Sequence, residues 1–389
     1  MASLAVTDIG ELTTNDPDAG DGPMGRRTGA GLVLDDGVVA WVGASRDTPA
    51  ADGVLDAQGG SVVPGFVDSH THLVFAGDRA DEFEARMAGA PYAAGGILRT
   101  VASTRGADTD ELAAGARRRL REMQASGTTT VEVKSGYDLT VEGEGRLLEV
   151  AGGVSDEVTF LGAHAVPAEH AADRDAYVAL VAGAMLERCA PEARWADAFC
   201  DPAAFSVDEC REVLVAARAA GLGLRLHANQ FGDSGGVELA AELGCASVDH
   251  CTHCSADGAR ALAGAGVVAT LVPAAEFCTR SPYADARRLV DAGVTVALAT
   301  DCNPGTSYVT SMPFVLALAV RELRLTFDEA LYAATAGGAA ALQRDDVGRL
   351  GVGSRGDLVV LDAPRAAHLA YRPGSVLVRS VLRAGAQLA

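Results

Sequence analysis

The stretch that decides the fold is Val62-Val-Pro-Gly-Phe-Val-Asp-Ser-His70-Thr-His72, an apolar run that ends in two histidines. Seven later stretches have a similar build, a short apolar run that in six of them is closed by a polar residue. The eight runs are Val62–Asp68, Thr128–Lys134, Glu157–His164, Trp195–Asp201, Leu222–His227, Ala246–His250, Gly266–Val272 and Val294–Asp301. Continuous apolar strands of this kind are typical of a parallel sheet that is covered on both faces.

Helical stretches separate these runs. Residues Asp110–Ser126 form one, and Ser206-x-x-Glu209 and Thr326-x-x-Glu329 are capping boxes that begin two others. Eight strand-then-helix units predict an α/β fold, a (β/α)8 barrel, whose catalytic groups lie at the C-terminal ends of the strands. Five of the eight histidines in the chain fall there: His70, His72, His164, His227 and His250.

The two ends of the chain have a different texture. Short β-branched runs bounded by Gly and Asp occur at Gly37–Gly43 and again at Asp357–Leu361 and Ser375–Val378. Neither end alone offers enough apolar strand to be stable. We therefore expect a small β-sandwich domain built from both chain ends, with residues 1–61 and 346–389 flanking a barrel of residues 62–345.

The charge balance limits the partners. The chain has 52 acidic and 32 basic side chains and a formal net charge of −20. Without a basic patch, binding to nucleic acid or to an anionic membrane surface is not expected. The charge itself selects no chemistry, and a small-molecule substrate is expected only from the motifs described below. Lys134 is the one lysine among the 32 basic residues, and such a composition is typical of a protein from a salty cytoplasm, a halophile.

The N-terminus and the cysteines indicate the compartment. Acidic residues occur early and no basic segment precedes an apolar core, so no signal peptide is expected. The eight cysteines are scattered through a chain too large to depend on disulfides. Free thiols in a reducing cytoplasm are the favoured interpretation.

Four polar residues at strand ends predict a metal site. His70 and His72 are two residues apart on an extended segment, so their side chains point to the same side. His227 and Asp301 close the fifth and eighth runs. Imidazole and carboxylate together suit Zn²⁺ or iron with a position left for water. Each residue alone fits a purely structural role equally well, but the joint pattern favours a metal.

These motifs make the chain resemble the amidohydrolase superfamily. PGFVDSHTH (64–72), the later His and Asp, and Gly351-x-Gly-x-x-Gly-Asp357 carry the general resemblance. HTHLVFAGDR (70–79), KSGY (134–137), LGAHAVP (161–167) and TDCNPGTS (300–307) resemble its imidazolonepropionase family more closely. The resemblance extends from about residue 35 to the C-terminus. It implies a metal-dependent cyclic amide hydrolase that converts 4-imidazolone-5-propanoate to N-formimino-L-glutamate in histidine degradation.

The resemblance also implies roles for single residues and an assembly. One Zn²⁺ or Fe²⁺/Fe³⁺ per chain would be held by His70, His72, His227 and Asp301. Two such chains would form a homodimer. Arg79 and Tyr92 would hold the propanoate, since a guanidinium offers a fork to a carboxylate. The substrate ring would be lined by Tyr137, His164, Gln230, His250 and Asn303.

Asp301 and His250 are the expected catalytic residues. Metal-activated water would attack the ring carbonyl, Asp301 would carry a proton to the leaving nitrogen, and either the metal or a protonated His250 would stabilise the oxyanion. One position departs from the family pattern, which usually has an acid where this chain has Gln230. An amide cannot accept a proton at neutral pH, so the identity of the general base stays open between Asp301 and His250.

Several alternatives stay open. Another cyclic amidase or a nucleobase deaminase would use the same scaffold, and a non-catalytic barrel would use the metal only as a structural staple. The pair Cys251 and Cys254 has a metal-like spacing but no second pair beside it, so incidental cysteines are favoured. In binuclear members of the superfamily, a carbamylated lysine that bridges two metals comes from the fourth strand. Lys134 ends the second run instead, which favours a structural or substrate-side role for it and a single metal.

Overall fold

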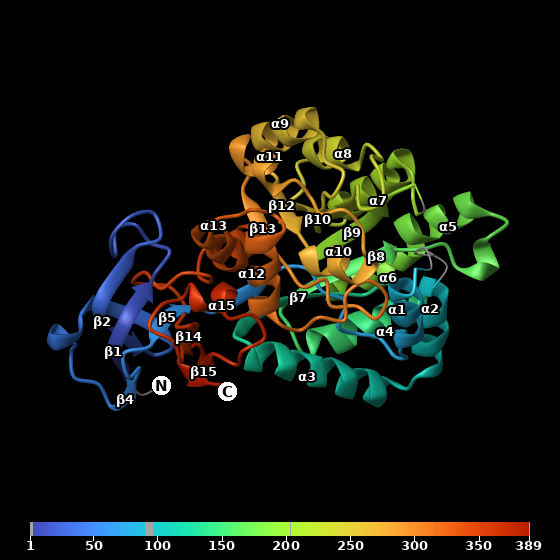
Figure 1. The fold of residues 1–389 in the computed structure, drawn as a ribbon. Coiled ribbons are helices and arrows are strands. Elements are labelled where there is room, and N and C mark those ends of the chain that lie inside the picture. The colour runs from blue at the N-terminus through green and yellow to red at the C-terminus, as the bar shows by residue number, and fades with distance from the viewer. Residues whose placement is uncertain (1–2, 90–95, 203, 389) are drawn as a thin grey trace. The chain divides into compact units, whose positions relative to one another are not determined.

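The computed structural model describes residues 3–89, 96–202 and 204–388, which form two compact units (Figure 1). The first unit comprises the described residues of 1–69, 121–130 and 311–389, and the second those of 70–120 and 131–310. The domain boundaries expected from the sequence, after residues 61 and 345, stay a prediction.

The first unit contains a mixed sheet made from both chain ends, here called the chain-end sheet. Its strands are β1 Leu4–Thr13, β2 Arg26–Asp35, β3 Val38–Ala44, β4 Gly53–Asp56, β5 Ser61–Pro64, β14 Leu358–Leu361, β15 Val378–Arg383 and β16 Ala386–Gln387. They run in the order β16-β15-β14-β5-β1-β2-β3, with β4 also paired to β1. Blue and red segments therefore lie side by side in Figure 1. The expected domain from both ends is confirmed.

The chain-end sheet has an apolar core to which several of its strands contribute, and β5 and β14 are buried along their whole length. Val6, Ile9 and Leu12 of β1 and Leu32 of β2 are buried and pack with Val360 of β14. The helices of this unit that lie beyond residue 310 are α12 Met312–Arg321, α13 Phe327–Tyr332, α14 Gly338–Ala341 and α15 His368–Tyr371, with a π-helical turn, Ala333–Gly337.

The second sheet is a nearly closed parallel barrel. Its strands are β6 Phe66–Asp68, β7 Thr128–Lys134, β8 Glu157–Ala163, β9 Trp195–Cys200, β10 Gly223–Ala228, β11 Ser247–His250, β12 Val268–Leu271 and β13 Val296–Leu298. They pair in strict chain order from β6 to β13. Each strand falls within, or overlaps by all but one residue, one of the eight runs expected from the sequence, so the (β/α)8 barrel is confirmed.

The first run is the exception to the expected boundaries. Val62–Asp68 was expected to be one barrel strand, but it divides at Gly65: Pro64 still pairs with Leu358 in the chain-end sheet, and the barrel strand begins at Phe66. Proline lacks an N–H for a second ladder. A Cβ at Gly65 would lie 2.2 Å from Thr129 Oγ1, so only glycine allows this close approach.

The first and last barrel strands meet through the residues that follow them. Thr71 and Cys302 form a parallel bridge. The Asp301 N–H donates to the His70 carbonyl at 3.1 Å, and the His72 N–H donates to the Cys302 carbonyl at 3.0 Å. This seam, residues 70–72 against 301–302, places His70 and His72 directly beside Asp301.

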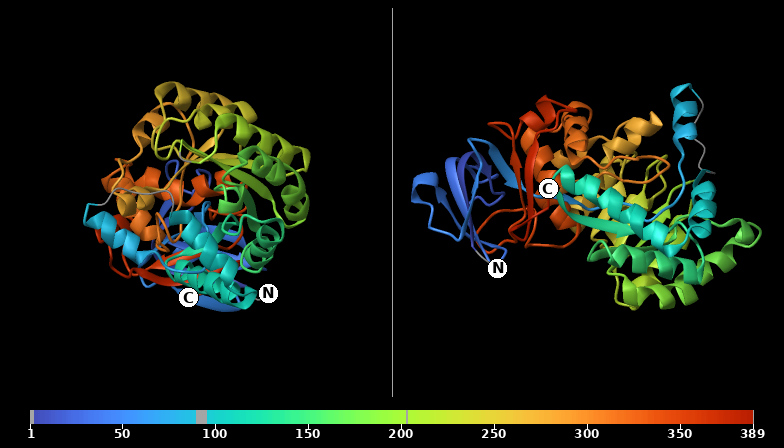
Figure 2. Two further views of the ribbon diagram at one scale, coloured as in Figure 1. Left: turned by 90° about the vertical axis from the view of Figure 1, so that its right-hand side faces the viewer. Right: turned by 90° about the horizontal axis from the view of Figure 1, so that it is seen from below.

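Helices follow the barrel strands, and in the left view of Figure 2 those of the second unit lie outside its strands. They are α1 Ala80–Met87, α2 Ile97–Gly106, α3 Thr109–Ala125 (which ends in the first unit), α4 Val141–Gly152, α5 Arg174–Leu180, α6 Leu186–Cys189, α7 Val207–Ala219, α8 Gly236–Leu243, α9 Ala256–Ala265, α10 Pro273–Thr279 and α11 Ala286–Asp291. Both predicted capping boxes, at Ser206 and Thr326, are present. Among the described residues, no helix has the length and apolarity needed to span a bilayer.

Candidate active site

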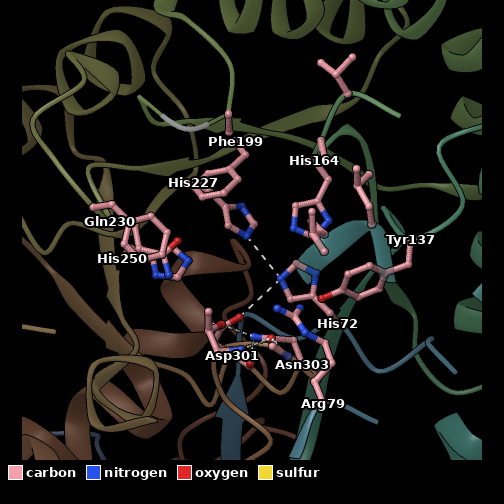
Figure 3. A pocket seen from close by; sticks show the side chains of 18 of the residues that line it. His72, Arg79, Tyr137, His164, Phe199, His227, Gln230, His250, Asp301 and Asn303 are labelled. Atoms are coloured by element: carbon pink, nitrogen blue, oxygen red, sulfur yellow. Dashed lines mark hydrogen bonds and ion pairs between the residues drawn. The ribbon is translucent and has the colours of Figure 1, made fainter. Parts of the chain in front are cut away.

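A pocket of about 260 Å³ opens at the C-terminal ends of the barrel strands, within the second unit. Nine of the residues predicted for the site line it, and they project inward from different strand ends (Figure 3). They are His72, Arg79, Tyr137, His164, His227, Gln230, His250, Asp301 and Asn303. His70 is completely buried and does not line the pocket, and Tyr92 lies outside the described residues. The size of the pocket suits a small molecule.

Three imidazoles and one carboxylate converge at the base of this pocket. The Nε2 atoms of His72 and His227 lie 3.4 Å apart. The Oδ1 atom of Asp301 lies 3.5 Å from Nε2 of His70 and 3.5 Å from Nε2 of His72. Figure 3 shows His72 between His227 and Asp301. The four residues predicted as metal ligands are thus brought together.

Two carboxylates fix the tautomers of two of these histidines. His70 Nδ1 donates to Asp249 Oδ2 at 2.6 Å, and His227 Nδ1 donates to Asp197 Oδ2 at 2.9 Å. Nε2 is therefore the ring nitrogen left to face the shared centre: it carries a lone pair in His227, and in His70 it would do so once a proton leaves. His70 Nε2 is completely buried and lies 3.5 Å from Asp301 Oδ1. Buried ring nitrogens aimed at one centre, with the other nitrogen backed by a carboxylate, fit a bound metal cation.

The electrostatics of the ligand set follow from this arrangement. Burial and the nearby Lys134 lower the pKa of His70, but the Asp249 carboxylate raises it more, to about 9. Burial lowers the pKa of His72, as do the neighbouring histidines. Burial raises the pKa of Asp301, but the hydrogen bond from His70 and the other histidines lower it below its ordinary value. Asp301 is therefore a carboxylate at neutral pH, and His70 would release a proton on binding a cation.

The loop after β13 holds Asp301 in an unusual backbone conformation, with φ of +52°. The Asn303 side chain stabilises this loop: its Nδ2 donates to the Asp301 carbonyl at 2.7 Å, and its Oδ1 accepts from the N–H groups of Gly305 and Thr306, each at 2.8 Å. Thr306 Oγ1 donates to Asp301 Oδ2 at 3.2 Å. The side chain of Asn303, expected to contact substrate, thus also shapes the site.

His164 and Tyr137 form one wall of the pocket. His164 Nδ1 donates to the Gly136 carbonyl at 2.9 Å, so its Nε2 is left as an acceptor. Burial lowers the pKa of His164 to about 3. The loop that carries Tyr137 is held by Glu144, whose carboxylate accepts from the N–H groups of Gly136 at 2.7 Å and Leu139 at 2.7 Å. This wall is therefore neutral and well supported.

His250 ends β11 with a left-handed backbone, φ +75°. Burial lowers its pKa to about 3, which favours a neutral imidazole over the protonated one that the sequence offered as one alternative for stabilising the oxyanion. Two residues on, Thr252 Oγ1 donates to Oε1 of the buried Glu276 at 2.7 Å. Burial raises the pKa of Glu276 to about 7, and its Oε2 has no hydrogen-bond partner among the described residues.

Arg79 supplies a buried guanidinium at the pocket wall. Its Nη2 donates to Glu82 Oε2 at 2.6 Å, and its side chain is 4% exposed. A Cβ at Gly305 would lie 2.3 Å from Arg79 Nη1, so glycine at this position leaves the space that the guanidinium occupies. The predicted cation, the Arg79 guanidinium, is therefore present at the pocket wall, although the chain as a whole has a formal net charge of −20.

Other site residues were not predicted. Phe199 and Arg174 line the pocket, and the Phe199 ring lies 5.5 Å from that of His227. Phe199 falls at the end of a predicted strand, which was a usable signal, whereas Arg174 is one of 31 arginines. Asp249 and Asp197, which accept hydrogen bonds from His70 and His227, were also not predicted. Both are acids within otherwise apolar runs, and that pattern marks an inward-facing polar group.

Lys134 lies beneath the pocket and does not line it. Its Nζ is 2.9 Å from Glu132 Oε1 and 2.9 Å from Asp197 Oδ2. Burial lowers the pKa of Lys134, but these carboxylates raise it above its ordinary value. The substrate-side role is thus not supported. Cys251 and Cys254 are free thiols, as are the other six cysteines.

The sequence of the chain is similar to those of known proteins. The model of a family described as the amidohydrolase family matches residues 61–388. An imidazolonepropionase of Salinispora arenicola (strain CNS-205) is 62% identical over 387 residues, which cover 99% of this chain and 98% of that protein. An imidazolonepropionase of Mycolicibacterium smegmatis is 58% identical over 385 residues, covering 99% and 97%.

Solved structures share the fold at much lower identity. A mutant of the atrazine chlorohydrolase TrzN from Arthrobacter aurescens TC1, complexed with zinc and atraton, has a TM-score of 0.74 at 18% identity, covering 99% of this chain and 94% of that one. An adenosine deaminase from Xanthomonas campestris with bound zinc has a TM-score of 0.71 at 20% identity, covering 99% and 92%.

Proposed function

The chain belongs to the amidohydrolase family, and we propose that it hydrolyses the ring of 4-imidazolone-5-propanoate to give N-formimino-L-glutamate, a reaction of histidine degradation. One observation carries this function: the Nε2 atoms of three histidines and the Asp301 carboxylate meet at the base of a pocket that also holds a buried arginine. The relatives named imidazolonepropionase match nearly the whole chain, and support the same activity.

His70, His72, His227 and Asp301 would hold one metal ion per chain, zinc or iron. A metal in such a site polarises a carbonyl and lowers the pKa of water from 15.7 to about 7. Residues beyond the four ligands favour catalysis over a structural staple, because a staple needs no lined pocket above it.

Asp301 is the proposed proton carrier. It is ionised at neutral pH and faces the pocket. In the reaction, water adds to the ring carbonyl carbon, the bond from that carbon to the ring nitrogen breaks, and Asp301 transfers one proton from the water to the leaving nitrogen. Gln230 lines the pocket at the position of the missing acid, where its amide can orient substrate but cannot accept the proton.

The neutral histidines are proposed to position the ring. Because His164 donates from Nδ1 to Gly136, its Nε2 can accept a hydrogen bond from a ring N–H. A neutral His250 has one N–H, which can donate to the carbonyl oxygen as negative charge develops there. Tyr137 and Asn303 complete the ring's surroundings.

Arg79 is proposed to bind the propanoate, with Tyr92 as a second contact. The guanidinium already pairs with Glu82, so a substrate carboxylate would share or replace that partner. For the remaining properties we propose a cytoplasmic homodimer with a surface adapted to salt. The free thiols favour a reducing compartment, and the acidic composition with a single lysine favours adaptation to salt.

The test is the loss of ultraviolet absorbance of freshly made imidazolonepropanoate, with and without a chelator. We expect turnover that the chelator abolishes and that added Zn²⁺ or Fe²⁺ restores. Absence of turnover at saturating protein and metal would exclude this function.

Arg79 distinguishes this substrate from a nucleobase or another cyclic amide without a carboxylate. Charge-assisted hydrogen bonds contribute about 1.5–3 kcal/mol, so Arg79→Ala should raise KM by more than about 10-fold, with an unchanged metal content. Arg118→Ala, at an exposed position of α3, is the matched control. An unchanged KM in R79A would count against propanoate recognition.

A further inference from the structure

A set of buried charges plays no part in the proposed mechanism. Five charged side chains from four barrel strands, here called the buried charge cluster, are completely buried beneath the pocket. They are Glu132 and Lys134 of β7, Asp197 of β9, Arg225 of β10 and Asp249 of β11. Isolated buried charges are strongly unfavourable, so these groups depend on one another.

Three carboxylates surround the Lys134 ammonium. Nζ lies 2.9 Å from Glu132 Oε1, 2.9 Å from Asp197 Oδ2 and 3.7 Å from Asp249 Oδ2. They belong to three different strands, and Lys134 offers three hydrogens. The ligand atoms of Asp197, Asp249 and His227 lie within 4.8 Å of one another, close enough to hold a cation, and Lys134 is the cation beside them.

Each of these carboxylates holds one part of the metal ligand set. Asp249 accepts from His70 Nδ1 at 2.6 Å, and Asp197 accepts from His227 Nδ1 at 2.9 Å. Glu132 Oε2 accepts from the Thr71 N–H, between His70 and His72, at 3.1 Å. Lys134 also contacts this segment directly, because its own N–H donates to the Thr71 carbonyl at 2.9 Å.

We propose that Lys134 is a positioning residue for the metal site: its ammonium fixes the three carboxylates that orient His70, His227 and the His70-Thr71-His72 segment. The inference rests on the metal site of the proposed function. It explains why the chain uses arginine at 31 of its 32 basic positions but lysine here. A compact ammonium lies within ion-pair distance of carboxylates from three strands, whereas a guanidinium is a larger planar fork. Arg225 already occupies the adjacent space, with Nη2 3.3 Å from Asp249 Oδ2.

The experiment measures cobalt binding and not turnover. The wild type, Lys134→Met and Lys134→Arg are stripped with a chelator, and Co²⁺ is titrated against a competing chelator while the visible spectrum of the bound ion is recorded. Loss of a group that orients metal ligands typically weakens affinity 10- to 100-fold. We expect that loss in K134M, with a changed cobalt spectrum, and no rescue in K134R.

Controls separate this role from general destabilisation. Arg355→Met removes the arginine that pairs with buried Asp357 at 2.5 Å in the first unit, and should leave Co²⁺ affinity unchanged. If K134M does not fold, as judged by circular dichroism, the double variant Glu132→Gln/Lys134→Met keeps the cluster's net charge and should still bind Co²⁺ weakly.

The outcomes are distinct. Wild-type affinity and spectrum in K134M, or in the folded double variant, would overturn the inference. Full rescue by K134R would overturn the part that requires lysine. Failure of the wild type to bind Co²⁺ would instead refute the metal site of the proposed function.

Discussion

The core of the chain-end sheet and the barrel interior below the pocket are equally sealed from solvent, but they bury opposite kinds of side chain. Leu32 and its neighbours are apolar, and the hydrophobic effect stabilises them without directional demands. The buried charge cluster contains groups such as Lys134 and Asp249, whose burial is tolerated only when each is paired. The first arrangement holds the fold together, and the second fixes where side chains of the site point.

The largest effect is expected at Asp301, above the buried charge cluster. Asp301→Asn keeps the size of the side chain but removes the carboxylate that would ligate the metal and carry the proton. Loss of the proton carrier alone lowers kcat/KM by about 10²- to 10⁴-fold, and metal content should fall as well, with little change in the unfolding midpoint of the metal-free protein. Asp291→Asn, at an exposed position of α11, should retain activity; wild-type turnover in D301N would contradict the assignment.

The opposite result is expected in the chain-end sheet. Leu32 is completely buried in β2, and Leu32→Ala should lower the free energy of unfolding by about 2–5 kcal/mol through lost burial and a cavity. Below the unfolding transition, kcat/KM and Co²⁺ affinity should match the wild type. Val54→Ala, at a position that is 68% exposed, is the control for urea denaturation. A fall in metal affinity in folded L32A would show that the two interiors are not separable in this way.

Glu276 is a third kind of buried group, neither apolar nor paired: no cation is paired to its carboxyl among the described residues. Its pKa is raised from 4.5 to about 7 by burial. Between these values the unfolded chain loses the proton while the folded chain keeps it, so the group lowers stability as pH rises through this window, and the full cost is present above pH 7.

Glu276→Gln should therefore gain stability over the wild type as pH rises from 5 to 8, by up to about 3 kcal/mol. The glutamine oxygen can still accept from Thr252. Glu212→Gln, at an exposed position of α7, should show no such trend in thermal unfolding. A difference between E276Q and the wild type that does not change with pH would mean that Glu276 is ionised in the folded protein.

Much of the architecture was predictable because the barrel strands are apolar runs with polar ends. That pattern predicts all eight strands. It also places His70, His72, His227 and Asp301 at the same ends of the strands, where the structure brings them together. It failed at Gly65, where a continuous run serves two sheets, because nothing in local apolarity marks a change of partner strand.

The supporting residues were harder to predict. Asp197 and Asp249 lie inside strands and not at the strand ends that marked the site, and their partners come from other strands far along the chain. The pKa of His250 could not be predicted for a related reason: burial lowers it, and burial depends on packing that the sequence does not specify locally.

The seam between residues 70–72 and 301–302 has a consequence for how the protein is made. The histidines that follow the first strand and the aspartate that follows the last are joined by a parallel bridge between Thr71 and Cys302. During synthesis His70 leaves the ribosome long before Asp301, and joining them closes a long loop at an entropic cost. The proposed ligand set would therefore be complete only after the barrel has closed, and metal uptake would then be a late step that reports finished folding.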